Sequence, residues 1–224
     1  MPNKNQEGIR DIPSDVKDPA LVDRRRMQIV DAAVRLFIEK GFHRTTTREI
    51  ARAAGISIGL LYEYVSTKED VLYLVCDAIH AEVERDVSRA LRRASRGRDR
   101  LAAMIRGYFR VCDRMSDHIL LVYQETRTLP SHWRERVLAN EVRVTGIFVD
   151  ALEELTGAGV LPSLDRKTLD LVAHDITVLG HMWTFRRWYL GRRYTLEDYI
   201  KKQTDIILGR TLGETAASGG KETP

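Results

Sequence analysis

Residues 45–65, with the sequence TTTREIARAAGISIGLLYEYV, constrain the fold of this chain more than any other stretch. Thr46 and Glu49 have the spacing of a capping box, in which the hydroxyl accepts a hydrogen bond from the third helical amide and the carboxylate accepts one from the capping residue's amide. Gly55 is expected to end this first short helix, because glycine adopts a left-handed conformation at little steric cost. Ser57 can cap a second short helix. The stretch therefore predicts two short helices joined by a tight turn.

Helices of about two turns are not stable alone. They are typical of a helix-turn-helix motif, whose second helix enters the major groove of DNA. Leu61 and Val65 can face inward, which leaves four side chains pointing outward, namely Ile58, Leu60, Tyr62 and Tyr64. The other interpretation is an ordinary helical hairpin within a core. Outward tyrosines flanked by Arg48 and Lys68 favour the DNA-binding motif, since such groups contact phosphates and base edges.

The run that begins at Gly41-Phe42, continues through residues 46–51 and 54–65 and ends at Lys68-Glu69 resembles the N-terminal DNA-binding domain of the TetR family of bacterial transcription regulators. The resemblance covers roughly residues 24–75. It implies an all-helical homodimer with one DNA-binding domain in each subunit. It also implies a variable C-terminal domain that binds a small inducer.

By position in the motif, the resemblance assigns DNA contacts to Thr46, Thr47, Arg48, Ser57, Ile58, Gly59, Leu60, Tyr62, Tyr64 and Lys68. Of these, Thr47, Tyr62, Tyr64 and Lys68 are expected mostly to hold phosphates. The chain departs from the family's common pattern at Ile58 and Leu60, where the family often has polar groups. Apolar side chains there can contact thymine methyl groups but donate nothing to guanine.

The expected organisation is all-α, with four segments. Residues 1–20 and 213–224 are polar tails expected to be disordered, residues 21–70 form the DNA-binding domain with its helix-turn-helix at about 46–65, and residues 71–212 form a regulatory and dimerisation domain. A composition with 43% hydrophobic and 30% charged residues is ordinary for a soluble globular protein. The net charge of +4 permits a nucleic-acid partner without proving one.

Two helix starts carry further predictions. The first helix should run from about Leu21 to Lys40, with Arg24-Arg25-Arg26 near its start, either as a solvated basic cluster or as phosphate contacts on the flanks of the operator. The fourth helix should begin at a second capping box, Ser66-Thr67-Lys68-Glu69, and end near Ser95.

A helix expected from about Asp165 to Leu190 carries two apolar stripes. One has the spacing of a coiled-coil seam, and its members are Leu169, Val172, Ile176, Leu179 and Trp183. The other contains His174, Val178, His181, Phe185 and Trp188. The seam should be buried against a symmetry mate or against the chain's own last helix, expected from Thr195 to about Leu212. That last helix should start with a box-like pair, Thr195 and Asp198. We predict a dimer interface made by the seam with Ile200 and Ile207 of that last helix.

The predicted effector cavity is bordered by Phe109, Tyr123, Glu141, His181, Phe185 and Arg186, although these residues could simply fill the core. Glu141 falls inside an apolar stripe, where a carboxylate must be paired or must line a wet cavity. The run from His181 to Gln203 resembles, less specifically, family subgroups that sense acyl-CoA and control fatty-acid degradation. That resemblance implies an acyl-CoA effector with its phosphates near Arg186, Arg187, Arg192 and Arg193; a multidrug-type effector is the alternative.

An enzyme is not expected, because no nucleophile elbow or dinucleotide fingerprint occurs. No catalytic, cofactor or metal site is predicted: His174 and His181 lie about two helical turns apart, and His80 with Glu84 has no third ligand nearby in the sequence. Cys76 and Cys112 are interpreted as buried reduced thiols of a cytosolic protein. The polar N-terminus is not typical of a signal peptide, and no apolar run is long enough for a membrane span. A helical adaptor that does not bind DNA is the second alternative.

Overall fold

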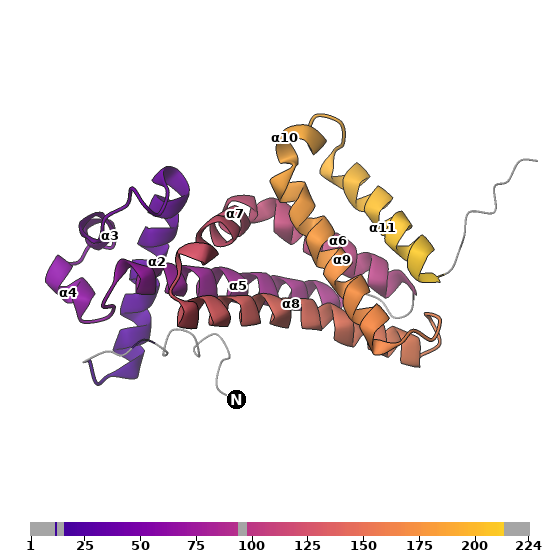
Figure 1. The fold of residues 1–224 in the computed structure, drawn as a ribbon, viewed down its shortest axis with the longest axis horizontal. Coiled ribbons are helices and arrows are strands. Elements are labelled where there is room, and N and C mark those ends of the chain that lie inside the picture. Colours follow the sequence, from indigo (N-terminus) through magenta and orange to yellow (C-terminus); the bar gives the residue numbers. More distant parts are fainter. Residues whose placement is uncertain (1–11, 13–15, 94–97, 213–224) are drawn as a thin grey trace, which may run out of the picture. The chain divides into compact units, whose positions relative to one another are not determined.

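The computed structural model of the chain describes residue 12 and residues 16–93 and 98–212. Every regular element in these residues is a helix (Figure 1), so the predicted all-α class is confirmed. The predicted tail 213–224 and most of the predicted tail 1–20 lie outside the described residues. Within the first tail, Ile12 is buried and the first helix already begins at Pro19.

The chain divides into two compact units. Unit 1 contains residues 1–84 and 115–142, and unit 2 contains residues 85–114 and 143–224. Two long helices, α5 (Lys68–Arg93) and α8 (Ser131–Gly157), therefore contribute to both units. Residues 71–84 and 115–142, which were expected in the regulatory domain, belong to unit 1, where the Trp133 indole donates to Asp70 at 3.0 Å.

Unit 1 contains α2 (Pro19–Lys40), α3 (Thr47–Ala53), α4 (Ile58–Tyr62), α7 (Ser116–Glu125) and the 3-10 helix η2 (Thr126–Thr128).

The predicted helix-turn-helix is formed by α3 and α4. The capping box is present, since the Glu49 amide donates to the Thr46 hydroxyl at 3.3 Å and the Thr46 amide donates to the Glu49 carboxylate at 2.8 Å. Gly55 has a φ of 70°, and the Ser57 hydroxyl accepts from the Leu60 amide at 3.1 Å. These local predictions are confirmed.

The second predicted capping box was wrong by one residue. Helix α5 begins at Lys68, and its box is made by Thr67 and Asp70. One Asp70 carboxylate oxygen accepts from the amides of Ser66 at 3.0 Å and Thr67 at 2.9 Å, while the Asp70 amide donates to the Thr67 hydroxyl at 3.0 Å. The other oxygen accepts from the indole of Trp133 at 3.0 Å, and this long-range bond favours Asp70 over Glu69.

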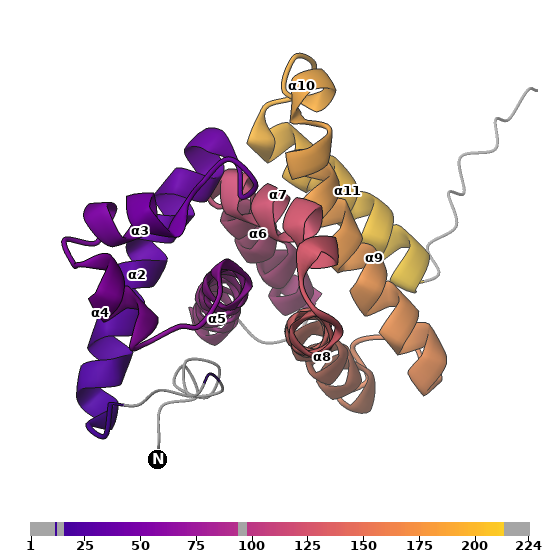
Figure 2. The same cartoon turned by 60° about the vertical axis from the view of Figure 1, so that its left-hand side comes forward.

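Unit 2 contains α6 (Arg98–Arg114), α9 (Arg166–Phe185), α10 (Arg187–Leu190) and α11 (Leu196–Leu212). Helices α9 and α11 lie side by side in both views, and α6 packs against both (Figures 1 and 2). The predicted continuous helix 165–190 is broken at Arg186, which separates α9 from α10. The predicted cap of the last helix is confirmed, because the Asp198 amide donates to the Thr195 hydroxyl at 3.1 Å.

Two glycines allow α6 to approach its neighbours closely. A Cβ atom at Gly180 of α9 would lie 2.5 Å from the Tyr108 ring of α6, and one at Gly107 of α6 would lie 2.5 Å from Cβ of Ala90 in α5. Real Cβ atoms do not come this close to their neighbours. No side chain larger than glycine therefore fits at either crossing without movement.

Candidate DNA-binding surface and effector site

The exposed side of the helix-turn-helix is organised by a contact between its two helices. The Thr47 hydroxyl at the start of α3 lies 3.1 Å from the Tyr62 hydroxyl at the end of α4. The Tyr62 side chain is 50% exposed, as predicted for a DNA contact. Thr46, Arg48, Ser57 and Gly59 are also exposed, and Ile58 and Leu60 are half-buried. The two short helices therefore present one hydroxyl pair toward solvent from two positions far apart in the sequence.

Tyr64 does not point outward, and this prediction was wrong. Helix α4 ends at Tyr62, so helical spacing no longer places Tyr64 on the same face. The side chain is 2% exposed. In this arrangement Tyr64 packs in unit 1 instead of presenting its hydroxyl to a phosphate.

Arg26 fixes the chain just after the helix-turn-helix of α3 and α4, which we call the reader, and it fits neither interpretation of the basic cluster. Arg26 is 1% exposed, and its guanidinium donates to the Tyr64 carbonyl from Nε at 3.0 Å and from Nη2 at 2.9 Å. Nη2 also donates to the Ile12 carbonyl at 2.6 Å. Burial lowers the pKa of Arg26, while the nearby carboxylates of Asp23 and Asp70 oppose that shift. Arg26 is a structural residue that ties α2 to the chain just after α4.

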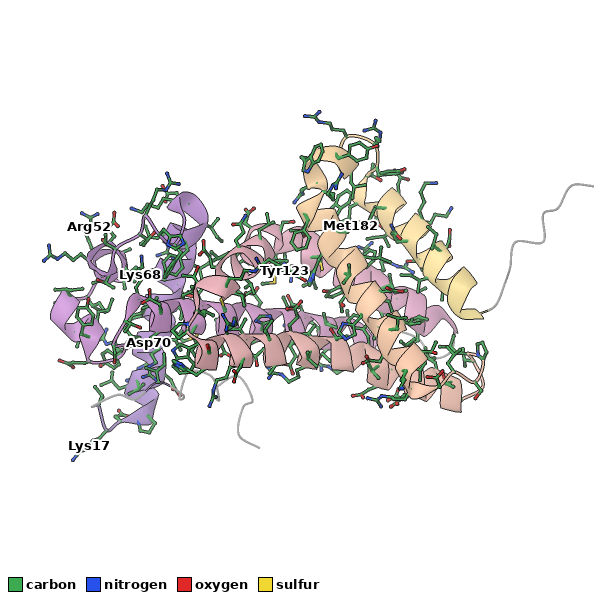
Figure 3. All side chains as sticks on the ribbon, in the orientation of Figure 1. Lys17, Arg52, Lys68, Asp70, Tyr123 and Met182 are labelled. Atoms are coloured by element: carbon green, nitrogen blue, oxygen red, sulfur yellow. The ribbon has the colours of Figure 1, made fainter. Side chains whose placement is uncertain are left out.

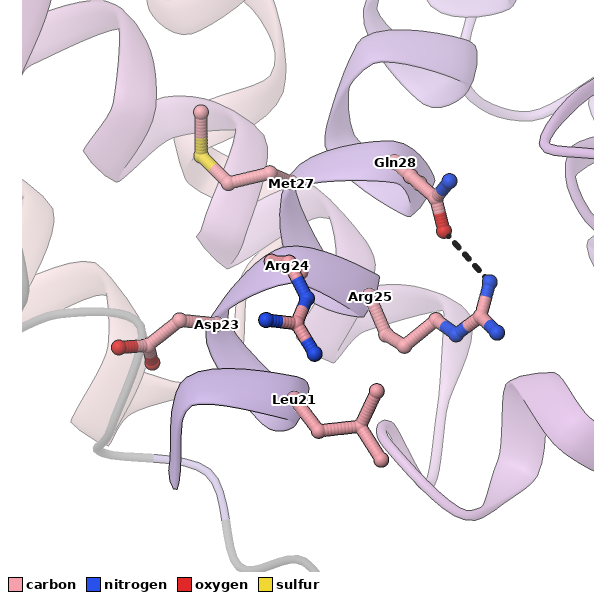
Figure 4. A pocket seen from close by; sticks show the side chains of 6 residues that line it. All are labelled: Leu21, Asp23, Arg24, Arg25, Met27 and Gln28. Atoms are coloured by element: carbon pink, nitrogen blue, oxygen red, sulfur yellow. Dashed lines mark hydrogen bonds between the residues drawn. The ribbon is translucent and has the colours of Figure 1, made fainter. Parts of the chain in front are cut away.

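The other two arginines of the cluster stay at the surface. Arg24 is exposed, and Arg25 donates to the Gln28 side chain at 2.9 Å (Figure 4). A shallow depression in this region is lined by α2 alone, through Leu21, Asp23, Arg24, Arg25, Met27 and Gln28 (Figure 4). A hollow lined by one helix cannot enclose a ligand, so the solvated interpretation and the phosphate interpretation both remain for Arg24 and Arg25.

Lys68 has partners within the protein. Its ammonium group donates to the carbonyls of Phe42 at 3.1 Å and Thr45 at 3.2 Å, and it lies 4.2 Å from the centre of the Phe42 ring. These bonds hold the turn that precedes α3. Lys68 is labelled in Figure 3. A phosphate contact by Lys68 therefore has to be made by an ammonium group that already stabilises the reader.

One basic residue of the surface was missed by sequence reasoning. Arg52 is exposed on α3, one turn after the predicted contact Arg48 (Figure 3). The spacing of four residues between these arginines places them on the same side of a helix and was the available signal. Arg44, before α3, instead donates to the Lys40 carbonyl at 2.6 Å.

The first part of α8 is fastened to the turn that follows the reader. The indole of Trp133 donates to Asp70, whose other oxygen caps α5, and the same indole stacks on Tyr73. Further along, the Asn140 amide donates to Asp77 of α5 at 2.9 Å. The first part of α8 is therefore bonded to the helix start that follows the turn after α4.

The predicted effector residues fall in both units. In unit 2, Phe109 is fully buried with its ring 5.7 Å from that of Tyr199, and His181 Nε2 lies 2.8 Å from the Tyr108 hydroxyl. The Phe185 ring lies 6.0 Å from the His181 ring, and Arg186 is exposed. These contacts join α6, α9 and α11 around a core that contains aromatic and polar groups.

In unit 1, the Tyr123 hydroxyl donates to the Glu141 carboxylate at 3.0 Å, between α7 and α8. Tyr123 is exposed and is marked in Figure 3. The Glu141 carboxylate thus has a hydroxyl partner on the neighbouring helix.

Both cysteines are free and buried, as predicted. Burial raises the pKa of each thiol to about 12. Because the thiolate is the reactive form, neither side chain has the properties of a nucleophile or a redox centre.

The predicted dimer seam is covered by the chain's own helices. Ile176 is 0% exposed, Leu169, Trp183, Ile200 and Ile207 are buried, and Val172 and Leu179 are half-buried. The Trp183 indole donates to Asp113 of α6 at 2.8 Å and its ring lies 5.0 Å from that of Tyr199 in α11. Of the two predicted partners, the chain's own last helix is the one observed, so the assignment of this seam to a subunit interface is corrected. Among the described side chains, the large apolar ones exposed on α9 and α11 are Leu171, Val178 and Ile206.

Two family models match the chain. The first, described as bacterial regulatory proteins of the tetR family, matches residues 29–73, and the second, described as a tetracyclin repressor-like C-terminal domain, matches residues 94–209. The second match alone covers more than half of the chain. The chain belongs to the TetR family.

Individual relatives agree with this assignment. The HTH-type transcriptional regulator HbdR of Aromatoleum sp. (strain CIB) is 29% identical over 208 residues, which are 92% of this chain and 90% of HbdR. The fatty acid metabolism regulator protein of Bacillus subtilis (strain 168) is 28% identical over 65% of this chain and 73% of that protein. The crystal structure of AibR, solved with isovaleryl coenzyme A and operator DNA, has the same fold with a TM-score of 0.64 and 20% identity over 81% of this chain and 97% of that chain.

These matches establish a TetR-family transcriptional regulator with a helix-turn-helix DNA-binding domain and a helical C-terminal domain. Within the described residues, no helix combines the length and the apolar character needed to cross a membrane.

Proposed function

We propose that this TetR-family regulator is a cytoplasmic repressor that binds a palindromic operator as a homodimer and is released by a small effector. The observation that carries the proposal is the reader itself, in which two capped short helices present the Thr47–Tyr62 hydroxyl pair on an exposed surface. Arg26 and Lys68 hold the two ends of this reader by bonds to backbone carbonyls. Such pre-formed geometry is what DNA recognition needs, because phosphate contacts set position and base contacts set specificity.

The residues of the reader are proposed to contact different parts of the DNA according to their chemistry. Thr47 and Tyr62 are proposed to hold phosphates, and Arg48 and Arg52 to contact phosphates or guanine. Ile58 and Leu60 are half-buried and are proposed to reach thymine methyl groups with their apolar tips. A reader of this kind favours sequences with A·T pairs at the positions that Ile58 and Leu60 contact.

A two-fold pair of readers would meet successive major grooves about 34–36 Å apart, or a longer spacing set by the operator. The face proposed to be covered by the second copy carries Leu171, Val178 and Ile206, which are exposed on α9 and α11. A dimer would remove these side chains from water, and burial of apolar area stabilises association.

The effector is proposed to be a fatty acyl group carried by coenzyme A. The fatty acid metabolism regulator of Bacillus subtilis and the AibR complex with isovaleryl coenzyme A support this choice. A multidrug-type hydrophobic effector is the alternative. The effector can shift the balance between DNA-bound and released states only by its differential affinity for them, typically about 1–3 kcal/mol.

The test begins with selection of duplexes from a random pool by the full chain. We expect a palindromic consensus, and loss of operator affinity in Tyr62→Ala, with Glu63→Ala, an exposed neighbour, as the matched control. Long-chain acyl-CoA is then titrated against the complex, with free fatty acid and free coenzyme A as controls. Selection that yields no consensus sequence would overturn the DNA-binding assignment, and release by no acyl length would overturn the acyl-CoA assignment.

A further inference from the structure

The segment between α9 and α11 has an unusual composition. Residues 186–194, with the sequence RRWYLGRRY, contain four arginines, one tryptophan and two tyrosines and no acidic residue. We name this segment the arginine–aromatic corner. It includes α10 and the turn that leads to the cap of α11.

The corner is a folded turn held by its own backbone. The amides of Leu190 and Tyr194 donate at 2.8 Å to the Arg186 carbonyl and at 2.9 Å to the Leu190 carbonyl, respectively. A Cβ atom at Gly191 would lie 2.9 Å from the Arg187 carbonyl oxygen, so glycine is needed for the chain to turn here. The side chains of the corner are therefore presented from a fixed backbone.

Four of these side chains are in contact one after another. The Arg186 guanidinium lies 5.2 Å from the centre of the Trp188 ring, and that of Arg193 lies 4.2 Å from the centre of the Tyr189 ring. The two rings are 5.8 Å apart and nearly perpendicular. Trp188 is nevertheless 63% exposed, whereas Trp133 and Trp183 are buried and bonded to carboxylates.

The four arginines are not equivalent. Arg187 lies 3.0 Å from Asp113, which neutralises its charge. Arg192 and Arg193 are exposed, and neither has an ion-pair partner within the described residues. The corner thus offers an exposed indole with the guanidinium of Arg186 on one side. It also offers two unneutralised guanidinium groups in the same turn, of which Arg193 lies over Tyr189, the ring next to Trp188.

An exposed aromatic face next to arginines is suited to a base and its phosphates. Bases stack on aromatic rings, and guanidinium groups bind phosphate oxygens in pairs of hydrogen bonds. An acidic peptide would use the arginines but not the open indole, and an acyl chain would need an enclosed pocket. A phosphorylated nucleotide uses both features.

We propose that the arginine–aromatic corner binds the 3′-phosphorylated adenine nucleotide of a coenzyme A thioester. The adenine stacks on the open face of Trp188, Arg186 supports the opposite face, and Arg192 and Arg193 pair with the phosphates. Arg187 takes no part, because its charge is used by Asp113. This inference rests on the proposed acyl-CoA response and assigns the part of the effector that lies outside the acyl pocket.

The test uses the tryptophan fluorescence of the full chain. Trp188 is the exposed one of three tryptophans, so stacking of adenine should quench its emission selectively. We expect saturable quenching by free coenzyme A, weaker binding of dephospho-coenzyme A, and no quenching by pantetheine. In Trp188→Phe the quenching should disappear; quenching of equal size in that variant, or none in the wild type, overturns the proposal.

Arginine variants test whether coenzyme A binds specifically at the corner or is attracted non-specifically by positive charge. Arg192→Gln should weaken binding of coenzyme A by about tenfold or more, because it removes a charge-assisted hydrogen bond. Arg106→Gln makes the same change of charge at an exposed arginine of α6 and should leave binding unchanged. An equal loss in both variants would indicate non-specific attraction and overturn the assignment.

The two proposals can fail separately. If acyl-CoA releases the operator equally well from the wild type and from Trp188→Ala, which has no ring for adenine to stack on, the corner is not the nucleotide site, although the acyl-CoA response stands. If coenzyme A quenches Trp188 but no acyl-CoA releases the operator, the nucleotide site stands and the proposed response is wrong. Protection of Trp188 from acrylamide in the free protein, without coenzyme A binding, would show that a second copy covers the corner and would overturn the inference.

Discussion

Trp133→Phe removes one hydrogen-bond donor and keeps an aromatic ring against Tyr73. In the wild type the indole donates to a buried oxygen of Asp70 at 3.0 Å. A hydrogen bond to a charged group contributes about 1.5–3 kcal/mol, and its loss leaves part of a buried carboxylate unsatisfied. We expect the free energy of unfolding to fall by about 2–3 kcal/mol. For a chain of this length that lowers the melting temperature by roughly 4–12 °C, measured by circular dichroism.

A double-mutant cycle tests whether the loss acts through Asp70. In an Asp70→Ala background, Trp133→Phe has no carboxylate to lose and should cost about 1–2 kcal/mol less than in the wild type. Trp183→Phe is the matched control, because its indole donates to Asp113 in unit 2 at 2.8 Å. Trp183→Phe should destabilise the protein but show no coupling to Asp70. Additivity of Trp133→Phe and Asp70→Ala within about 0.5 kcal/mol would refute the reasoning.

Three further outcomes can be measured. Arg26→Met leaves the buried Tyr64 carbonyl without its donor and should lower the free energy of unfolding by about 2–4 kcal/mol in urea titrations, since an unsatisfied buried group costs about 1–3 kcal/mol. Gly180→Ala pushes a methyl group into the Tyr108 ring and should cost about 1–3 kcal/mol in the same assay. The hydrogen bond from Lys40 and then that from the Thr46 amide lower the pKa of Glu49 from its ordinary 4.5 to about 2, so its stabilising effect is complete above pH 4.5 and is lost as the pH falls toward 2. The stability difference between wild type and Glu49→Gln should shrink across that interval.

The sequence predicted helix caps and turns correctly where they depend only on residues close together in the chain. The box of Thr46 and Glu49, the turn at Gly55 and the cap at Thr195 depend on residues within one helical turn, and all three are observed. The Thr67–Asp70 box was misplaced because two registers have the same spacing. The choice between them involves Trp133, which lies far along the chain.

Long-range partners account for the remaining differences. The bonds from Arg26 to Tyr64 cross 38 residues, so no periodicity could show that an arginine is buried at that point. The stripe of Leu169, Ile176 and Trp183 correctly identified an apolar face, but amphipathic spacing does not tell which helix covers it. The structure shows that α6 and α11 of the same chain do.

The crossing of α6 and α9 limits how unit 2 can deform. At Gly180 the Tyr108 ring occupies the space that a side chain would fill, and the Tyr108 hydroxyl is hydrogen-bonded to His181, the next residue, at 2.8 Å. This close packing resists movement of α6 and α9 toward or along each other, because packed interiors do not deform continuously. An effector that acts on unit 2 is therefore expected to rotate α6 and α9 together as one rigid body. The angle between these two helices should stay the same, and the chain segments outside their crossing should change conformation.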